Sequence, residues 1–111
     1  MKMSRRFQRA GVVYLVSEPH GMFKIGHTTR IEERFKTLQL ACPYDLQLLD
    51  ILLVTDRHQA ETFIHGVLAQ YHSRGEWFSL PNGKADYDKA VSLLRSIHPS
   101  LLSDPSVYVY A

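Results

Sequence analysis

The spacing of apolar positions changes along the chain, and each spacing predicts a different element. Residues 12–16 (VVYLV) form an uninterrupted apolar run, which is typical of a strand buried on both faces. The next residues, 17–21 (SEPHG), contain proline and glycine and predict a tight turn. Residues 22–26 are therefore expected to return as an antiparallel second strand. The most apolar run, 46–54 (LQLLDILLV), predicts a third strand at the centre of the sheet.

Three other segments repeat their apolar residues at helical spacing. Thr29 followed by Glu32 predicts a capping box and a helix from about Arg30, which Pro43 ends. Asp56 is expected to cap a long helix over residues 57–72, and a last helix is expected over 84–97. The positions predicted to face inward are Ile31, Phe35, Leu38 and Cys42, then Ala60, Phe63, Ile64, Val67, Leu68 and Tyr71, and finally Tyr87, Ala90, Val91, Leu94 and Ile97.

The remaining segments divide the chain into one domain and two ends. Residues 76–80 predict a short apolar strand, with Trp77 and Phe78 in the core. Residues 1–10 are expected to form a flexible basic arm, 11–98 a single domain and 99–111 a tail. Alternating valine and tyrosine at 107–110 suits an added edge strand, a dimer contact or a mobile end. The sequence leaves these three alternatives open.

Composition limits the size of the hydrophobic core and indicates the cellular location of the protein. A chain of 111 residues with 45% apolar content builds one modest core. The single cysteine, Cys42, excludes an internal disulfide framework and a cysteine zinc site, which predicts a reducing, cytoplasmic location. Without an identifiable base, Cys42 is better interpreted as a small buried residue than as a nucleophile. The run at 12–16 is too short for a secretion signal or a membrane span.

Charge is distributed unevenly. The formal net charge is +2, but residues 1–36 carry eight Lys/Arg against three Asp/Glu, and residues 37–111 carry five against eight. The basic end is a candidate surface for a polyanion, and a purely solvated tail is an equally good interpretation. Charge alone does not decide between them.

Several chemistries lack their motifs. The sequence has no GxxxxGK[ST], GxGxxG or HExxH pattern, which excludes the usual nucleotide-binding loops and one zinc protease class. His58, His65 and His72 recur every seven residues. They would lie near one helix face, but too far apart to bind one ion.

The residues that remain suit phosphodiester chemistry: Tyr14, Lys24, His27, Arg30, Arg34 and Glu61. The order of VYL at 13–15, KIG at 24–26, Arg34 and Glu61 resembles the GIY-YIG endonuclease superfamily. The segment KIGHTT, the step from Glu61 to His65 and RGEWF at 74–78 are similar to its phage T5 Orf172-like branch. The resemblance covers roughly residues 12–80.

This resemblance implies a fold and a mechanism. The fold would be α+β, with a three-stranded antiparallel sheet flanked by helices, in the order strand, strand, helix, strand, helix, short strand, helix. The activity would be divalent-metal-dependent cleavage of DNA, with one Mg²⁺ or Mn²⁺ on Glu61. Arg34 would bind a phosphate oxygen. Tyr14 would be the general base, with its pKa lowered by Lys24 beside it.

Two departures from the superfamily pattern stand out. Lys24 replaces the second tyrosine, and the late asparagine has no clear counterpart, since Asn82 lies in a predicted turn. His27 could shuttle a proton or bind phosphate, or it could be a polar turn residue. His65 and Glu76 are expected to be structural or supporting residues.

The predicted partner is DNA, single- or double-stranded, with a homodimer or a larger partner protein as a further possibility. Residues expected to contact nucleic acid are Arg5, Arg6, Arg9, Lys24, Arg30, Arg34 and Lys36. The alternative to a nuclease is a DNA-binding module with the same fold that does not cleave. A protein-interaction domain in a phage-defence or mobile-element setting is a third interpretation.

Overall fold

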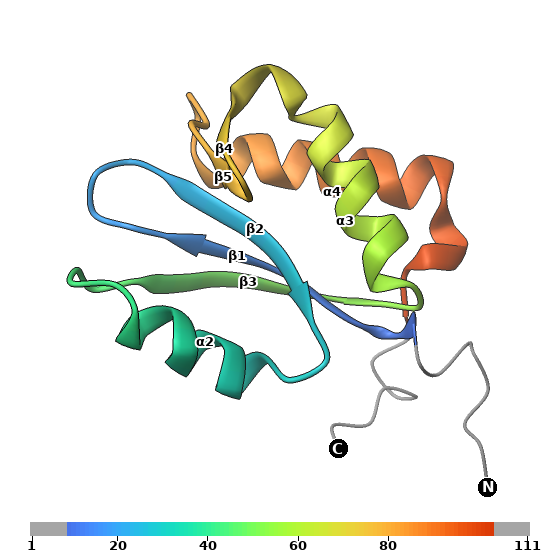
Figure 1. Ribbon diagram of the computed structural model, residues 1–111. Coiled ribbons are helices and arrows are strands. Elements are labelled where there is room, and N and C mark those ends of the chain that lie inside the picture. Colours follow the sequence, from blue (N-terminus) through green and yellow to red (C-terminus); the bar gives the residue numbers. More distant parts are fainter. Residues whose placement is uncertain (1–8, 104–111) are drawn as a thin grey trace, which may run out of the picture.

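The strand β1 (Gly11–Ser17) is the centre of the structure, a computed structural model that describes residues 9–103. β2 (Phe23–Thr28) and β3 (Gln47–Val54) flank β1, and each pairs with it antiparallel (Figure 1). Residues 12–16 are fully buried, because helices cover both faces of the sheet. The prediction of a first strand buried on both faces is therefore confirmed.

The sheet has five strands rather than the three predicted. β4 (His72–Arg74) and β5 (Trp77–Phe78) extend it on the β2 side, and the strand order is β3-β1-β2-β5-β4. The described strands all pair antiparallel. The short strand predicted at 76–80 corresponds to β5, although it was not expected in the sheet, and β4 was missed because three residues are too few to show an alternating pattern.

The prediction that the third strand is central is wrong, because β3 lies at an edge of the sheet. Leu49 and Leu52 of β3 pack on one side and Leu53 packs on the other, whereas Leu48 and Ile51 are exposed. The strand is apolar because both of its faces are partly covered. The apolar composition of β3 indicates that its two faces are covered. It does not indicate which strands lie beside β3.

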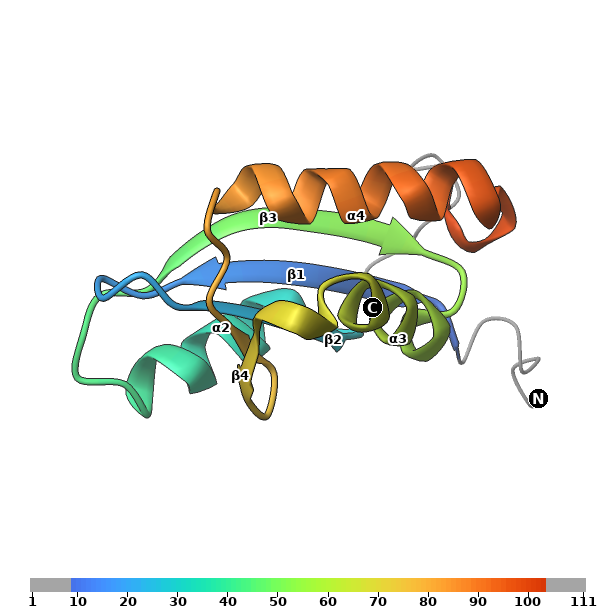
Figure 2. The same ribbon diagram turned by 90° about the horizontal axis from the view of Figure 1, so that it is seen from above.

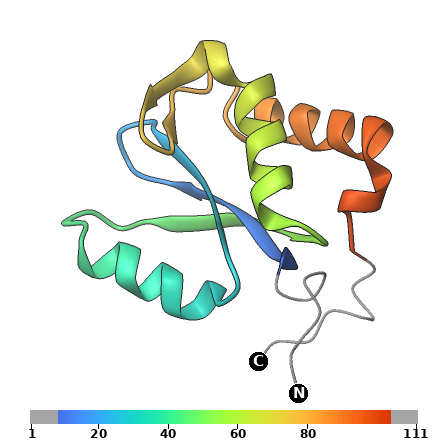
Figure 3. The same cartoon turned by 45° about the vertical axis from the view of Figure 1, so that its right-hand side comes forward.

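Helices cover the two faces unequally. α2 (Ile31–Leu40) lies on one face, and α3 (Arg57–Val67) lies with α4 (Lys84–Ile97) on the other (Figures 1 and 3). The view from above shows α3 and α4 together on their face, with α3 close to β2 (Figure 2). The side chains of alternate β1 residues therefore pack into two different hydrophobic cores.

We call the larger cluster the α3–α4 core and the smaller one the α2 core. The buried members of the α3–α4 core are Val13, Leu15, Ile25, Val54, Ala60, Ile64, Leu68, Phe78, Leu80, Tyr87, Ala90 and Leu94. Those of the α2 core are Val12, Tyr14, Val16, Ile31 and Leu46, with Phe35, Leu38, Cys42, Leu53 and Trp77 packed against them. Most predicted inward positions are confirmed. Ile97 is an exception at 56% exposed, because it ends the last turn of α4 beyond the packed face.

The two predicted helix caps had different outcomes. Asp56 caps α3 as predicted, since its carboxylate accepts a hydrogen bond from the Gln59 amide at 3.1 Å. The Thr29 and Glu32 capping box is wrong, because the N-cap is Arg30 and no side chain caps the helix there. Instead the Thr28 hydroxyl oxygen accepts from the Arg30 amide at 3.0 Å. The start of the helix was nevertheless predicted to within one residue.

The helix predicted over 57–72 is shorter than expected. α3 ends at Val67, and a 3₁₀ turn, η1 (Ala69–Tyr71), leads directly into β4. Gly75 then has a φ of +57°, which glycine adopts readily, and the chain turns into β5. The apolar spacing misled because Leu68 and Tyr71 still pack inward from the 3₁₀ turn and its flank.

The chain returns to β3 at its end. η2 (Pro99–Leu101) follows α4, and Leu102 then forms an antiparallel bridge with Val54. The Thr55 amide donates to the Leu101 carbonyl at 2.9 Å, and the Ser103 amide donates to the Leu53 carbonyl at 3.1 Å. The predicted arm up to residue 8 and the alternation at 107–110 lie outside the described residues. Within residues 9–103, no helix is long and apolar enough to cross a membrane.

Candidate active site

The site begins where β2 loses its neighbouring strand. β5 pairs only with Phe23 and Lys24 of β2, so the edge of β2 beyond Lys24 is open to other groups. The Ile25 amide donates to the Glu76 carbonyl at 3.0 Å, and His65 Nε2 donates to the Ile25 carbonyl at 2.7 Å. His65 thus satisfies a strand edge, as expected of a histidine at a helix–sheet junction. These two bonds bring α3 and the β4–β5 turn against β2.

Tyr14 reaches this edge from β1. It pairs with Gly26 across the hairpin, and an added Cβ on Gly26 would lie 2.5 Å from Tyr14 Cζ and 3.0 Å from Glu76 Oε1. The tyrosine ring end and the glutamate carboxylate therefore meet over the glycine. The Tyr14 side chain is 0% exposed, and its hydroxyl has no hydrogen-bond partner of good geometry in residues 9–103.

The charges around Tyr14 pull its pKa in opposite directions. Burial raises the pKa of the Tyr14 hydroxyl above its usual value, and the carboxylates of Glu76 and Glu61 add to that rise. The Arg34 guanidinium, from α2, is the group that lowers it. The expectation that Lys24 lowers this pKa is therefore wrong. Its ammonium lies 3.3 Å from Glu76 Oε1 and forms an ion pair there.

Lys24 is held on two sides. Besides Glu76, it lies 5.4 Å from the centre of the Trp77 ring, within the range of a cation–π contact. Both partners come from the short β4–β5 hairpin, which no periodicity predicted. Lys24 is thus fixed by the hairpin, and its charge is directed to a carboxylate rather than to the tyrosine.

Glu61 stands on α3 between two histidines, with its side chain only 15% exposed. Its Oε2 lies 3.9 Å from His27 Nε2, and its Oε1 lies 4.0 Å from His65 Nε2. Burial raises the pKa of Glu61 to about 7, and charge repulsion and a hydrogen bond with Glu76 contribute. Lys24 and Arg34 act in the opposite direction. Glu61 Oε2 has no hydrogen-bond partner among the described residues.

His27 extends the site along β2. Burial lowers the pKa of His27, and the neighbouring His58 and Arg57 lower it further, so the ring is neutral at pH 7. Its Nδ1 is buried without a hydrogen-bond partner in the part of the chain that the structure describes. The His58 ring lies 4.3 Å from the His27 ring, centre to centre.

The sequence that builds this site matches a known domain family. Residues 11–95, which run from the start of β1 into the last turns of α4, match the model of the T5orf172 domain. The chain belongs to the T5orf172 domain family. This domain is of a GIY-YIG-like, phage-associated endonuclease type. No match was found among curated proteins or among solved structures.

The T5orf172 match includes every described element that builds the site. The β1–β2 hairpin supplies Tyr14, Lys24 and His27, α2 supplies Arg34, and α3 supplies Glu61. The structure therefore brings the five predicted catalytic residues into one neighbourhood, with Glu76 and His65 at its border. Family membership indicates a nuclease-like or DNA-binding module.

The residues predicted to bind nucleic acid are more scattered. Arg30, Arg34 and Lys36 are exposed on or beside α2, with Arg30 paired to Glu33 at 3.1 Å. Arg9 lies elsewhere, at the start of α3, where its Nη1 is 3.9 Å from Asp56 Oδ2. Arg5 and Arg6 lie outside the described residues. Arg30 and Arg34, one turn apart, therefore lie on the same side of the helix, whereas Lys36 projects from a different side.

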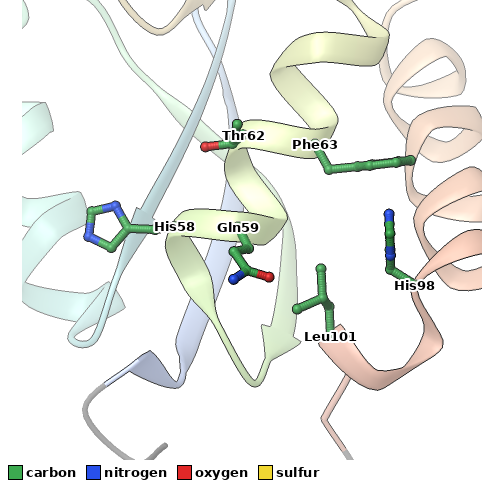
Figure 4. Close-up of a pocket in the computed structure, with 6 residues that line it drawn as sticks. All are labelled: His58, Gln59, Thr62, Phe63, His98 and Leu101. Carbon is green, nitrogen blue, oxygen red and sulfur yellow. The ribbon is translucent and has the colours of Figure 1, made fainter. Parts of the chain in front are cut away.

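His58 is the site neighbour that the sequence interpretation missed. Its spacing of three before Glu61 and seven before His65 places it on the same side of α3. A hollow of about 380 Å³ lies between α3 and the end of the described chain, lined by His58, Gln59, Thr62, Phe63, His98 and Leu101 (Figure 4). The His58 ring points away from Phe63 and His98 in that view, so it belongs more to the candidate site than to the hollow.

Proposed function

We propose that this T5orf172 domain is a divalent-metal-dependent endonuclease that hydrolyses DNA phosphodiester bonds. The observation that carries the proposal is the buried hydroxyl of Tyr14, which has no hydrogen-bond partner of good geometry among the described residues and lies near the charged groups of Arg34, Glu61 and Glu76. A buried hydroxyl without a partner costs stability. Packing alone does not require that cost, and catalytic sites are where such groups concentrate.

The chain's own residues would divide the chemistry. Tyr14 Oη would accept the proton of the attacking water as a new P–O bond forms and the P–O bond to the leaving oxygen breaks. Because the pKa of Tyr14 is raised in the free protein, the phenol must lose its proton to start the reaction. Neutral His27 is suited to relay that proton. Arg34 would bind a phosphate oxygen and favour both the phenolate and the negatively charged transition state.

The carboxylates fit a hard divalent cation. The Glu76 carboxylate helps to raise the pKa of Glu61, so the two carboxylates lie near each other, and Glu61 Oε2 has no partner among the described residues. Mg²⁺ and Mn²⁺ bind one or two carboxylates together with waters and phosphate oxygens. Within residues 9–103, no group of three or more His, Cys, Asp or Glu residues could hold a metal, so a partly hydrated ion on Glu61 suits this set. The ion would stabilise negative charge on the phosphate and acidify a water.

A binding module without cleavage is the second candidate. The observation that favours it is the ion pair between Lys24 and Glu76, which directs the charge of Lys24 away from Tyr14. Together with the raised pKa of Tyr14, it would leave the tyrosine protonated. The exposed basic residues of α2 would still contact phosphates without reading sequence.

A cleavage assay decides between the two candidates. Single- and double-stranded DNA are incubated with Mg²⁺, with Mn²⁺ or with a chelator, and with wild type, Glu61→Ala or Arg34→Ala. The matched controls are Glu32→Ala and Arg95→Ala, which remove exposed charges from α2 and α4. We expect metal-dependent cutting by wild type and both controls, and a loss of at least about 100-fold in the two site variants.

Two outcomes contradict the proposal in different ways. Salt-dependent DNA binding by wild type with no cutting in any metal would leave the binding module as the function. Undiminished cutting by Glu61→Ala and Arg34→Ala would show that the reaction occurs elsewhere on the chain.

A further inference from the structure

Glu76 occupies a position that the established family assignment does not explain. It lies in the turn between β4 and β5, and its carbonyl accepts from the Ile25 amide. Its backbone is therefore anchored to β2, and its side chain is directed over Gly26 toward Tyr14 and Glu61. A residue needed only to complete the strand edge would require its carbonyl alone.

Gly26 makes room for that side chain. A Cβ at this position would lie 3.0 Å from Glu76 Oε1 and 2.5 Å from Tyr14 Cζ, closer than real Cβ atoms approach other groups. The absence of a side chain on Gly26 thus lets a carboxylate and a phenol share one space. The buried Tyr14 hydroxyl has no hydrogen-bond partner in residues 9–103 and lies in the same space.

The second carboxylate, Glu61, enters from α3. Its Oε1 lies 4.0 Å from His65 Nε2. Because His65 and Glu76 bond the carbonyl and the amide of Ile25, Glu61 and Glu76 are brought to the same point of β2. Glu61 Oε2 is buried without a partner in the described part of the chain. Two carboxylates close together repel each other unless a proton or a cation lies between them. Lys24 offsets part of this charge from one side, 3.3 Å from Glu76 Oε1. A carboxylate has two oxygens, so Glu76 can bind a second partner while Oε1 stays paired with Lys24.

We propose that Glu76 is a second protein ligand for the divalent cation, so that the ion is held jointly by Glu61 and Glu76 beside the Tyr14 hydroxyl. The inference rests on the proposed function, which needs only Glu61 as a ligand. The joint site gives a role to the nearby carboxylates, to the glycine at position 26 and to a Tyr14 hydroxyl that has no hydrogen-bond partner among the described residues. Waters and a substrate phosphate would complete the shell of the ion.

Metal binding without DNA tests the inference. Mn²⁺ is titrated into wild type, Glu61→Gln and Glu76→Gln, and free Mn²⁺ is measured by electron paramagnetic resonance. Glu32→Gln is the matched control, since it is exposed on α2. We expect saturable binding of one ion by wild type and by the control. Each site variant should lose at least about tenfold in affinity, a typical loss when a carboxylate of a metal site is removed.

The ion pair with Lys24 needs a control of its own. Removing Glu76 also frees Lys24, and a free ammonium would repel the cation without any loss of a ligand. Lys24→Met and the double variant Lys24→Met/Glu76→Gln separate the two effects. If Glu76 is a ligand, the double variant binds Mn²⁺ at least about tenfold more weakly than Lys24→Met alone. Equal affinity of the two would overturn the inference, and so would the absence of saturable binding by wild type.

The outcomes also separate this inference from the proposed function. If Glu76→Gln binds Mn²⁺ as wild type does while wild type cuts DNA and Glu61→Gln does not, the second ligand is wrong and the nuclease remains. If both carboxylates are needed for Mn²⁺ but no DNA is cut, the joint site stands and the nuclease proposal fails.

Discussion

The two faces of β1 are packed to very different extents. On one face, Val13 and Leu15 join the twelve buried residues of the α3–α4 core. On the other, Val12, Tyr14 and Val16 belong to the five buried residues of the α2 core. The larger core contains the apolar area that makes the domain stable. The smaller one contains Tyr14, so the proposed general base lies on the face that contributes less to stability, whereas Glu61 comes from α3 on the other face.

The comparison predicts that the same isoleucine-to-alanine substitution lowers the free energy of unfolding by different amounts on the two faces. Ile64→Ala, in the α3–α4 core, should lower the free energy of unfolding by about 3–5 kcal/mol, because its neighbours on all sides are fixed. Ile31→Ala, at the start of α2, should cost about 2 kcal/mol, because the smaller cluster can collapse around the gap. Urea denaturation measures both. Equal losses would show that the two cores contribute alike.

Gly26→Ala tests how tightly the α2 side is built around Tyr14. The added methyl would meet Tyr14 and Glu76, so we expect a loss of about 1–3 kcal/mol and displacement of the tyrosine ring. Gly66→Ala is the matched control, because nothing lies within 4 Å of an added Cβ in that helix, and it should stabilise by about 0.5–1 kcal/mol. Thermal unfolding of both variants gives the comparison. A neutral Gly26→Ala would mean that Tyr14 and Glu76 are not confined.

The start of α4 offers a pH test on the other face. Asp86 accepts from the Asn82 amide at 2.9 Å and from its side chain at 3.1 Å, and these bonds lower the pKa of Asp86. Because the folded pKa is below the unfolded one, the contribution is present above about pH 4 and is lost as pH falls through the folded pKa. Asp86→Ala should lower Tm by roughly a few degrees at pH 7.

That difference in Tm should shrink as both proteins approach pH 2. Lys89→Ala, on the exposed side of the same helix, should change Tm little at either pH. A difference between wild type and Asp86→Ala that does not depend on pH would contradict the role of the charge.

Tyr14→Phe should have the smallest effect on stability. The substitution removes a buried hydroxyl that has no partner in the described residues, so the free energy of unfolding should stay the same or rise by up to about 1 kcal/mol. Cleavage should be lost if Tyr14 is the general base. Tyr87→Phe provides a comparison, because the buried Tyr87 hydroxyl also has no partner of good geometry within residues 9–103 but lies in the α3–α4 core. It should leave cleavage unchanged, and an equal loss of activity would point to a general effect of removing a hydroxyl.

How far the sequence predicted the structure depends on the length of each element. The first strand, α3 up to Val67 and α4 were predicted because their apolar periods extend over enough residues. The edge position of β3 was missed because strand order depends on pairing with distant segments. The short strand at 76–80 was predicted and contains β5, but β4 and the pairing of both strands with β2 were missed because these strands are too short for any period.

The candidate site shows the same limit. Tyr14, Lys24, His27, Arg34 and Glu61 were named from motif resemblance, and the fold brings them together. Sequence motifs identify the residues of the site, but they do not show which charged side chains lie next to one another. That Lys24 pairs with Glu76, and that Arg34 is the cation beside Tyr14, depends on the β4–β5 hairpin and on the position of α2. Residue spacing along the chain predicts neither the Lys24–Glu76 ion pair nor the position of Arg34 beside Tyr14.

The bridge at Val54 has a consequence for how such a domain is built into larger proteins. Val54 pairs with Gly11 on one side and with Leu102 on the other, so residues 11 and 102 lie at one corner of the described structure. A stretch whose two boundaries lie together can be inserted into a surface loop of a host protein with little distortion of either partner. Residues 11–102 thus present both boundaries at a single corner, and the first of them lies close along the chain to Tyr14.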